Sequence, residues 1–287
     1  MSTQITTAFV EQYSSNIQML SQQKGSILRD KVRLESVTGK NAFFDQVGSV
    51  TASVRSTRHS DTPQSNTPHS RRRVSLVDYE FADLIDDLDK VRMLVDPTST
   101  YALAAAYAMG RAMDDAIIAA ALGASDTGVA GGTSVALPSG QKITESGTAG
   151  LTIAKLRQAK EIIDLNSVDP SLPRHIIVSP KQITDLLGTT EVTSSDFNTV
   201  KALAQGDINT FLGFNFIVSN RLAIASNKRK CIAFVSDGLA LAVGKDSTAR
   251  IDERADKGYA TQVYYSAAFG STRMEEEKVV EIQAHEA

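Results

Sequence analysis

The sequence predicts an α+β protein, and three observations lead to this class. One alanine-rich stretch has the length and the end signals of a single long helix. Helical and buried-strand patterns alternate after it, and the last part of the chain, from Ala249 to Gln283, has mostly strand patterns. No internal repeat is visible. The chain has 287 residues, which suits one large domain or two small ones.

The first 75 residues are basic although the whole chain has a net charge of −3. They hold ten Lys and Arg side chains against five Asp and Glu side chains. A basic segment on an acidic body can contact nucleic acid, or it can lie across the acidic body of a neighbouring copy. No aromatic residues are interleaved with Arg71, Arg72 and Arg73, so protein–protein contact is the favoured interpretation.

A polar arm is predicted over residues 1–42 and a long β-hairpin over residues 43–81. Apolar residues alternate with polar ones on both limbs: Val50, Ala52 and Val54 on the first, and Val74, Leu76 and, loosely, Tyr79 and Phe81 on the second. Between the limbs, residues 59–69 contain no aliphatic side chain, so the tip of the hairpin must project. A two-stranded ribbon is marginally stable alone, which predicts a partner surface.

A short amphipathic helix is predicted next, from Phe81 to Val95. Its acidic residues lie mainly opposite the apolar ones: Glu80, Asp83, Asp86 and Asp87. They could bind a divalent cation. No glycine-bearing calcium loop and no histidine accompanies them, which favours a solvated helix face.

The long helix is predicted to begin at Asp96-Pro97 and to end at Leu122. About 26 residues at 1.5 Å each give a rod of roughly 39 Å. Its many alanines allow close packing, which we expect to be against a sheet, and Gly123 can supply a left-handed stop. Seven glycines follow within residues 123–150, which predicts a flexible insertion or surface loop at a subdomain boundary.

The second half of the chain alternates helices and strands. Helices are predicted at Thr152–Leu165 and from Ser179-Pro180 to Leu187. Strands are predicted at 175–178, 214–219, 231–235, 259–269 and 279–283.

No catalytic constellation is found, and no cofactor or metal site is predicted. Residues 238–247 superficially resemble a phosphate loop, but the glycine spacing is one residue too long and Asp246 replaces the metal-binding hydroxyl. Residues 123–128 resemble a nucleophile elbow, but the second glycine is one position late. The four histidines share no metal-ligand spacing: His59, His69, His175 and His285.

The single cysteine, Cys231, rules out an internal disulfide framework and suits a reducing compartment. It opens a predicted strand with no histidine nearby, which indicates a buried structural thiol. No secretory signal is visible at the N-terminus, and Arg111, Asp114 and Asp115 interrupt the longest apolar stretch, which argues against a membrane span. We therefore expect the protein to be made in the cytosol.

Several stretches resemble the major capsid proteins of tailed bacteriophages, which have the Hong Kong 97-type fold. Val178-Ser179-Pro180 leading to Leu186-Leu187 is similar to a strand-to-helix junction of that family, followed by Ser194–Phe197. Gly206–Phe214, continuing to Ser219-Asn220 and Leu222, resembles the family's turn-and-strand element. Residues 249–257, 270–273 and 277–282 are similar to its closing strands. The shared order of these motifs across more than half of the chain carries the resemblance.

The resemblance implies a shell-building protein rather than an enzyme. It implies five parts: an N-terminal arm (1–42), an extended loop (43–81) over a neighbouring subunit, a peripheral domain with the spine helix and glycine-rich loop (82–149), an axial domain (150–245), and closing strands returning to the peripheral domain (246–287). Copies would form hexamers and pentamers of an icosahedral virion shell around double-stranded DNA, contacted non-specifically. Assembly would occur in the host bacterial cytoplasm with a portal and without a membrane.

Five arginines are the candidates for contacts with acidic residues of an adjacent subunit: Arg55, Arg58, Arg71, Arg72 and Arg73. The alternative for them is a solvated or DNA-facing charge run. Some family members cross-link subunits through a lysine on the extended loop, but no lysine lies between Asn41 and Lys90, so self-catalysed cross-linking is not expected. The chain also lacks a long helical N-terminal extension, which predicts a separate scaffolding protein. The rival functions are a nanocompartment shell of the same fold, carrying an enzyme cargo, and, more distantly, a hydrolase.

Overall fold

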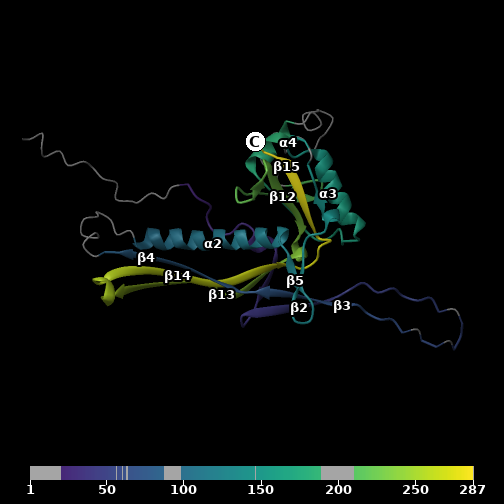
Figure 1. The fold of residues 1–287 in the computed structure, drawn as a ribbon, viewed down its shortest axis with the longest axis horizontal. Helices are drawn as coiled ribbons and strands as arrows, with labels where there is room; N and C mark the ends of the chain where they lie inside the picture. The colour runs from purple at the N-terminus through teal and green to yellow at the C-terminus, as the bar shows by residue number, and fades with distance from the viewer. Residues whose placement is uncertain are drawn as a thin grey trace, which may run out of the picture. The chain divides into compact units, whose positions relative to one another are not determined.

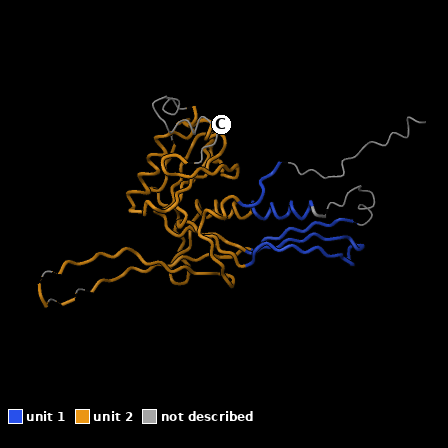
Figure 2. The backbone as a smooth tube through the Cα atoms, turned by 180° about the vertical axis from the view of Figure 1, so that it is seen from behind, with its two compact units in different colours: residues 1–26, 78–111, 245–268 blue, residues 27–77, 112–244, 269–287 orange. Residues whose placement is uncertain are grey.

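The computed structural model describes residues 21–55, 57–59, 61–62, 64–86, 98–145, 147–188 and 210–286. The chain divides into two units (Figure 2). Unit 1 combines residues 1–26, 78–111 and 245–268, and unit 2 combines residues 27–77, 112–244 and 269–287. The predicted five-part division names roles in an assembled shell, and it stays a prediction.

The mixed composition of helices and strands agrees with the predicted α+β class (Figure 1). The described helices are α2 (Thr98–Leu122), α3 (Ile153–Leu165) and α4 (Pro180–Leu187). The strands of the first half are β1 (Arg33–Ser36), β2 (Asn41–Val47), β3 (His69–Ser75), β4 (Val77–Ile85), β5 (Ser125–Thr127), β6 (Thr133–Val135) and β7 (Lys142–Ile143). Those of the second half are β8 (Arg174–Val178), β9 (Thr210–Phe211), β10 (Phe214–Val218), β11 (Ile224–Ala225), β12 (Lys228–Val235), β13 (Leu239–Arg254), β14 (Ala260–Arg273) and β15 (Val279–His285).

A seven-stranded mixed sheet forms the core of unit 2, in the order β7-β15-β12-β8-β10-β9 with β11 beside β12. Its central strands are continuous apolar runs. Residues 231–235 of β12 and 176–178 of β8 have no exposed surface, as expected for strands buried on both faces. Helix α3 packs against β15 and buries Leu156, Ala159 and Ile163. The strands predicted at 175–178 and 231–235 are confirmed as β8 and β12. The two helices predicted in the second half of the chain are confirmed as α3 and α4.

A second sheet in unit 2 has the order β2-β3-β5-β6. The predicted hairpin is confirmed at its base, where β2 and β3 pair antiparallel from Asn41↔Ser75 to Val47↔His69. Its predicted first limb around Val50 to Val54 forms no strand in the described residues. The glycine-rich segment is not merely a loop, because β5 and β6 extend this sheet and β7 joins the larger one. The glycines between these short strands interrupt the strand pattern in the sequence, so the strands were not predicted.

Unit 1 contains the outer parts of β4, β13 and β14 and the first half of α2 (Figure 2). The helix predicted from Phe81 is wrong at its start, since Phe81–Ile85 continue strand β4. Phe81 and Ile85 fit a helical stripe, but Val77, Tyr79 and Phe81 alternate with polar residues, and pairing of β4 with β14 continues the strand to Ile85. The remainder of that predicted helix, residues 87–95, lies outside the described residues, as do residues 1–20 and 189–209 of the arm and family motifs.

The long helix is confirmed as α2, ending at Leu122 as predicted. Its predicted start at Asp96-Pro97 lies outside the described residues. At Gly110 the helix packs closely against the backbone of Gly25 and not against a sheet. A Cβ on Gly110 would lie 2.4 Å from the carbonyl carbon of Gly25. The left-handed stop predicted at Gly123 is wrong, since the φ of Gly123 is not positive. Glycine is favoured at this position for a steric reason, because a Cβ on Gly123 would lie 2.7 Å from the carbonyl oxygen of Ala119.

Candidate subunit-contact site

The hairpin of unit 2 has an ordered base, β2 and β3, and beyond it the ribbon, residues 48–68. At their junction the backbone N–H of Gly48 donates to the carbonyl of Pro68 at 2.8 Å. Beyond this bond the described part of the ribbon contains no strand, and its side chains are exposed. Figure 1 shows two extended segments leaving the ends of β2 and β3. Three consecutive arginines on β3, Arg71, Arg72 and Arg73, form ion pairs with three different acidic residues at the base.

Arg71 forms a cross-strand pair with Asp45, its direct partner in the β2–β3 register. Its Nε and Nη2 donate to the two carboxylate oxygens at 2.5 and 3.2 Å, and its guanidinium lies 5.5 Å from the centre of the Phe43 ring. The hydrogen bond from Arg71 lowers the pKa of Asp45. Both side chains face solvent, so this pair contributes little to the folding free energy.

Arg72 points to the other face of the strand and is buried, with 8% of its surface exposed. Its Nε donates to the carbonyl of Met274 at 2.9 Å, and its Nη2 donates to Glu276 Oε2 at 2.5 Å. Gln46 donates to the same Met274 carbonyl at 2.9 Å. These contacts tie the hairpin base to the turn between β14 and β15.

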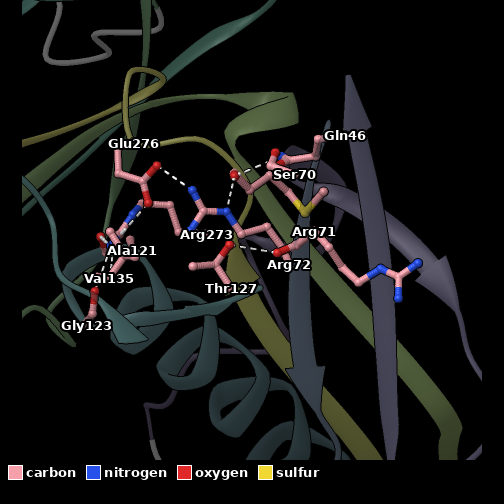
Figure 3. Close-up of polar contacts among 11 residues, drawn as sticks. Gln46, Ser70, Arg71, Arg72, Ala121, Gly123, Thr127, Val135, Arg273 and Glu276 are labelled. Carbon is pink, nitrogen blue, oxygen red and sulfur yellow. Dashed lines mark hydrogen bonds and ion pairs between the residues drawn. The ribbon is translucent and has the colours of Figure 1, made fainter. Parts of the chain in front are cut away.

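Glu276 is shared with a second buried guanidinium, that of Arg273, whose Nη2 lies 3.6 Å from Glu276 Oε1 (Figure 3). Arg273 is fully buried and donates to three backbone carbonyls, those of Ala121 at 3.1 Å, Gly123 at 2.6 Å and Val135 at 2.9 Å. The carbonyls of Ala121 and Gly123 lie at the C-terminal end of helix α2, where the helix dipole favours a cation. Burial lowers the pKa of Arg273, and the charge of Glu276 opposes this effect.

Arg73 completes the base by donating from Nη2 to Asp126 Oδ2 at 2.5 Å, across the β3–β5 pairing. Its side chain runs past Gly131, where a Cβ would lie 2.6 Å from Arg73 Cδ. Gly131 also has a φ of 64°, so two independent constraints favour glycine there.

Arg55 and Arg58 differ from these three arginines. Both are exposed on the ribbon, and neither forms an ion pair with any residue that the structure describes. Arg55 makes a local bond, from Nε to the carbonyl of Thr57 at 3.1 Å. Large apolar side chains accompany them: 57% of Val50 and 95% of Val54 are exposed. The ribbon therefore presents exposed positive charge and exposed apolar surface together.

The five arginines predicted from the sequence fall into two groups in the structure, and Arg273 and Glu276 were not among the predicted residues. Arg71 to Arg73 form ion pairs inside their own chain. Their pairing with an adjacent subunit stays a prediction, as does that of Arg55 and Arg58. The signal that could have identified Arg273 is a charged residue closing a strand of small and apolar residues.

Two of the features considered for catalysis lie in strands. Residues 239–247 lie in strand β13 and form no phosphate loop. Cys231 has no exposed surface, and burial raises the pKa of its thiol to about 12, as suits a structural thiol. Among the described residues, no three His, Cys, Asp or Glu side chains are placed to hold a metal ion. No described helix combines the length and the hydropathy needed to cross a membrane.

A protein-family model described as "Phage capsid protein" matches residues 5–286, almost the whole chain. The chain belongs to the phage capsid protein family. A search of curated proteins finds no match. Membership in this family makes the protein a structural capsid protein rather than an enzyme, and it does not favour the nanocompartment shell.

Solved capsid structures share the fold of this capsid protein. The capsid of the cyanophage P-SCSP1u matches with a TM-score of 0.77 and 19% identity, covering 100% of this chain and 96% of that chain. The capsid of Ralstonia phage GP4 matches with 0.77 and 12% identity, covering 97% and 96%. The acid-stable capsid of Helicobacter pylori bacteriophage KHP30 matches with 0.73 and 11% identity, covering 99% and 98%. The predicted Hong Kong 97-type fold is therefore confirmed.

Proposed function

We propose that this capsid protein is the main subunit of an icosahedral phage head, in which hexamers and pentamers enclose double-stranded DNA. The observation that carries this proposal is the ribbon itself, a segment with exposed valines and exposed arginines on a base fixed by buried ion pairs. Exposed apolar surface beside charge is typical of a protein contact site. The ribbon would lie over a neighbouring copy, with the spine helix in a peripheral domain and residues 150–245 in an axial domain.

The first test of this proposal is size-exclusion chromatography of the purified full chain, followed by negative-stain electron microscopy. We expect shells, or rings of six copies, that elute far ahead of the 30.8 kDa monomer. A homogeneous monomer that does not assemble under crowding or with a scaffolding protein would contradict the proposal.

All five arginines stay candidates for contacts with an adjacent subunit, and Arg55 and Arg58 are the two that a charge reversal can test separately from folding. Reversing Arg71 to Arg73 would also break ion pairs inside the chain, so that change cannot isolate assembly. We expect R55E/R58E to remain folded and to lower the yield of assembled particles. The matched control R55K/R58K keeps the charges and should assemble normally. Equal assembly of both variants would leave the alternative, a solvated or DNA-facing charge run.

The proposed partners during assembly are further copies, a separate scaffolding protein and a portal, in the host bacterial cytoplasm, with the mature protein in the virion. DNA would be contacted through charge without base recognition. The absence of a lysine between Asn41 and Lys90 supports subunits that are not cross-linked through the extended loop. Uniform closed shells from expression of this chain alone would argue against a separate scaffold.

A further inference from the structure

Strand β2 forms an outer edge of its sheet over residues 41–47. In the described part of the chain its strand neighbour is β3 alone, since the sheet has the order β2-β3-β5-β6. At one end of this pairing the N–H of Gly48 donates to the carbonyl of Pro68 at 2.8 Å. At the other end the N–H of Leu76 donates to the carbonyl of Lys40 at 2.9 Å. Such bonds recur at every second residue of an antiparallel pair, so the even-numbered residues of β2 bond to β3.

The odd-numbered residues therefore direct their backbone N–H and C=O groups to the edge: Asn41, Phe43, Asp45 and Val47. These groups form no hydrogen bond with another residue that the structure describes. The edge carries one charged residue, Asp45, whose charge is matched by Arg71 of the same chain. It contains neither proline nor glycine. Natural edge strands commonly carry charges, prolines or bulges against pairing, and this strand has little of that protection.

The side chains of the same strand add an exposed apolar surface beside the edge. Exposure reaches 42% for Phe43 and 66% for Val47. The guanidinium of Arg71 lies 5.5 Å from the centre of the Phe43 ring. An exposed aromatic side chain next to an arginine is typical of the centre of a protein contact. The backbone and the side chains of β2 thus both favour another strand as the partner of this edge.

We propose that β2 of one copy pairs antiparallel with β2 of a second copy, around a two-fold axis at Phe43. In this register Phe43 lies opposite its counterpart, and Asn41 lies opposite Asp45 on both sides of the axis. All three residues direct their backbone groups to the edge, so they meet as hydrogen-bonded pairs. The Asn41 amide can donate to the Asp45 carboxylate, and the two Phe43 rings form a cross-strand aromatic pair. A second copy fits this edge because the strand complements itself.

Other registers of the two strands fit less well. A shift by one residue would set residues with edge-facing groups opposite residues whose groups already bond to β3, and it would turn the side chains to opposite faces. The next symmetric register, centred on Phe44, would set Asp45 opposite Phe43. It would also make the two Asp45 carboxylates diagonal neighbours on one face, where like charges repel. The register centred on Phe43 avoids both faults.

The proposed contact uses the same residues on both copies, so it is isologous. A ring of five or six copies is held together by head-to-tail contacts instead. Pairing of β2 would therefore join one ring to the next. The inference rests on the proposed shell function and names a contact between rings.

Disulfide trapping of Phe43→Cys in the full chain tests this pairing. Residues of a hydrogen-bonded pair have Cα atoms about 5.5 Å apart, which a disulfide can bridge. Cys231 is buried and does not compete. We expect oxidised protein to give a band of two linked chains on a non-reducing denaturing gel, which reducing agent collapses to one chain. No higher ladder is expected, because each chain carries one introduced thiol.

The matched control is Val47→Cys, on the same strand and the same face. Val47 is more exposed than Phe43, so random collisions would link its thiol at least as readily. In the proposed register the two thiols at position 47 would be eight residues apart along the strands, about 27 Å. The control should therefore give no dimer.

The two proposals fail in different ways in this experiment. If the wild-type chain forms neither rings nor shells, the proposed function fails, and linkage of the soluble F43C chains still decides whether the strands pair. If F43C forms particles by electron microscopy but links no better than V47C, the strand pairing is overturned and the shell function stands.

A backbone variant gives a second, independent test. Asn41→Pro removes an N–H group that faces the edge, and Asn41→Ala removes the same amide side chain but keeps the N–H. Because this N–H has no described acceptor in its own copy, we expect the two variants to share one urea midpoint. The protein concentration needed for assembly should be about thirtyfold higher for N41P, the effect of one hydrogen bond on each side of the axis. Assembly of both variants at the same concentration would overturn the pairing.

Discussion

The base of the hairpin and its ribbon are continuous in sequence and opposite in chemistry. At the base, Arg72 and Arg273 are buried around Glu276, and each guanidinium also donates to backbone carbonyls of the same chain. On the ribbon, Arg55 and Arg58 are exposed and have no ion pair among the described residues. Buried charges must be satisfied within the chain, since an unpaired buried charge is strongly destabilising. Exposed charges cost the monomer little and stay available to another copy.

This difference teaches that a run of arginines need not act as one patch. Arg71, Arg72 and Arg73 are adjacent in sequence, but the alternation of the strand turns Arg72 to the buried face and its neighbours away from it. We therefore expect the contact surface on the ribbon, where positively charged side chains are exposed and pack against no core. We do not expect it on β3, where the arginines are most concentrated.

The largest expected effect comes from removing the ribbon. Deleting residues 49–67 joins Gly48 to Pro68, whose backbones already share a hydrogen bond. We expect assembly to be lost while the urea midpoint stays close to that of the wild type, because the ribbon contributes no described core residue. Electron microscopy and urea unfolding measure the two effects. A large fall in the urea midpoint would show that the ribbon contributes to folding as the base does, and would contradict the contrast between them.

The next effect is that of Arg273→Met, which keeps the side-chain volume but removes the buried cation. Three carbonyls lose their donor and Glu276 loses one of its two cationic neighbours. We expect the free energy of unfolding in urea to fall by about 3–5 kcal/mol. Arg254→Met is the control, because Arg254 pairs with Asp256 at the surface and its loss should leave the urea midpoint unchanged.

A matched pair on one strand compares the two faces of the base directly. Arg72→Met should lower the free energy of unfolding by about 2–3 kcal/mol, because Met274 and Glu276 each lose a hydrogen bond in a buried place. Arg71→Met, one residue away, should leave the urea midpoint unchanged because its pair with Asp45 is exposed. Equal losses in the two variants would show that burial does not separate these arginines.

The smallest effect is a pH dependence that arises in the core. His175 is buried, with its Nε2 3.2 Å from Ser236 Oγ, and burial lowers the pKa of His175, with a smaller contribution from Lys31. The folded state therefore favours the neutral ring. Its contribution to stability is complete above the unfolded pKa of about 6.5 and is lost as the pH falls towards the folded value. Urea titrations from pH 7.5 to 5 should show this slope, and His175→Gln should reduce it.

Elements whose signals lie within a short stretch of the chain could be predicted from the sequence. Helix α2 ends at Leu122 as predicted, and the apolar runs of β8 and β12 are buried strands. The projecting hairpin follows from residues 59–69, which contain no aliphatic side chain and so cannot fold onto a core. The order of these elements, with the family motifs, was enough to predict the capsid fold.

Features that depend on a partner far away in the sequence became visible in the folded chain alone. Phe81–Ile85 have a pattern compatible with a helix or a strand, and β14 makes them a strand. Small strands within the glycine-rich segment exist because β3 and β15 offer them edges. The separation of Arg72 from Arg55 depends on Glu276, more than 200 residues further along the chain. Local propensity cannot encode such pairs, because burial and hydrogen bonding between remote segments arise only when the chain is folded.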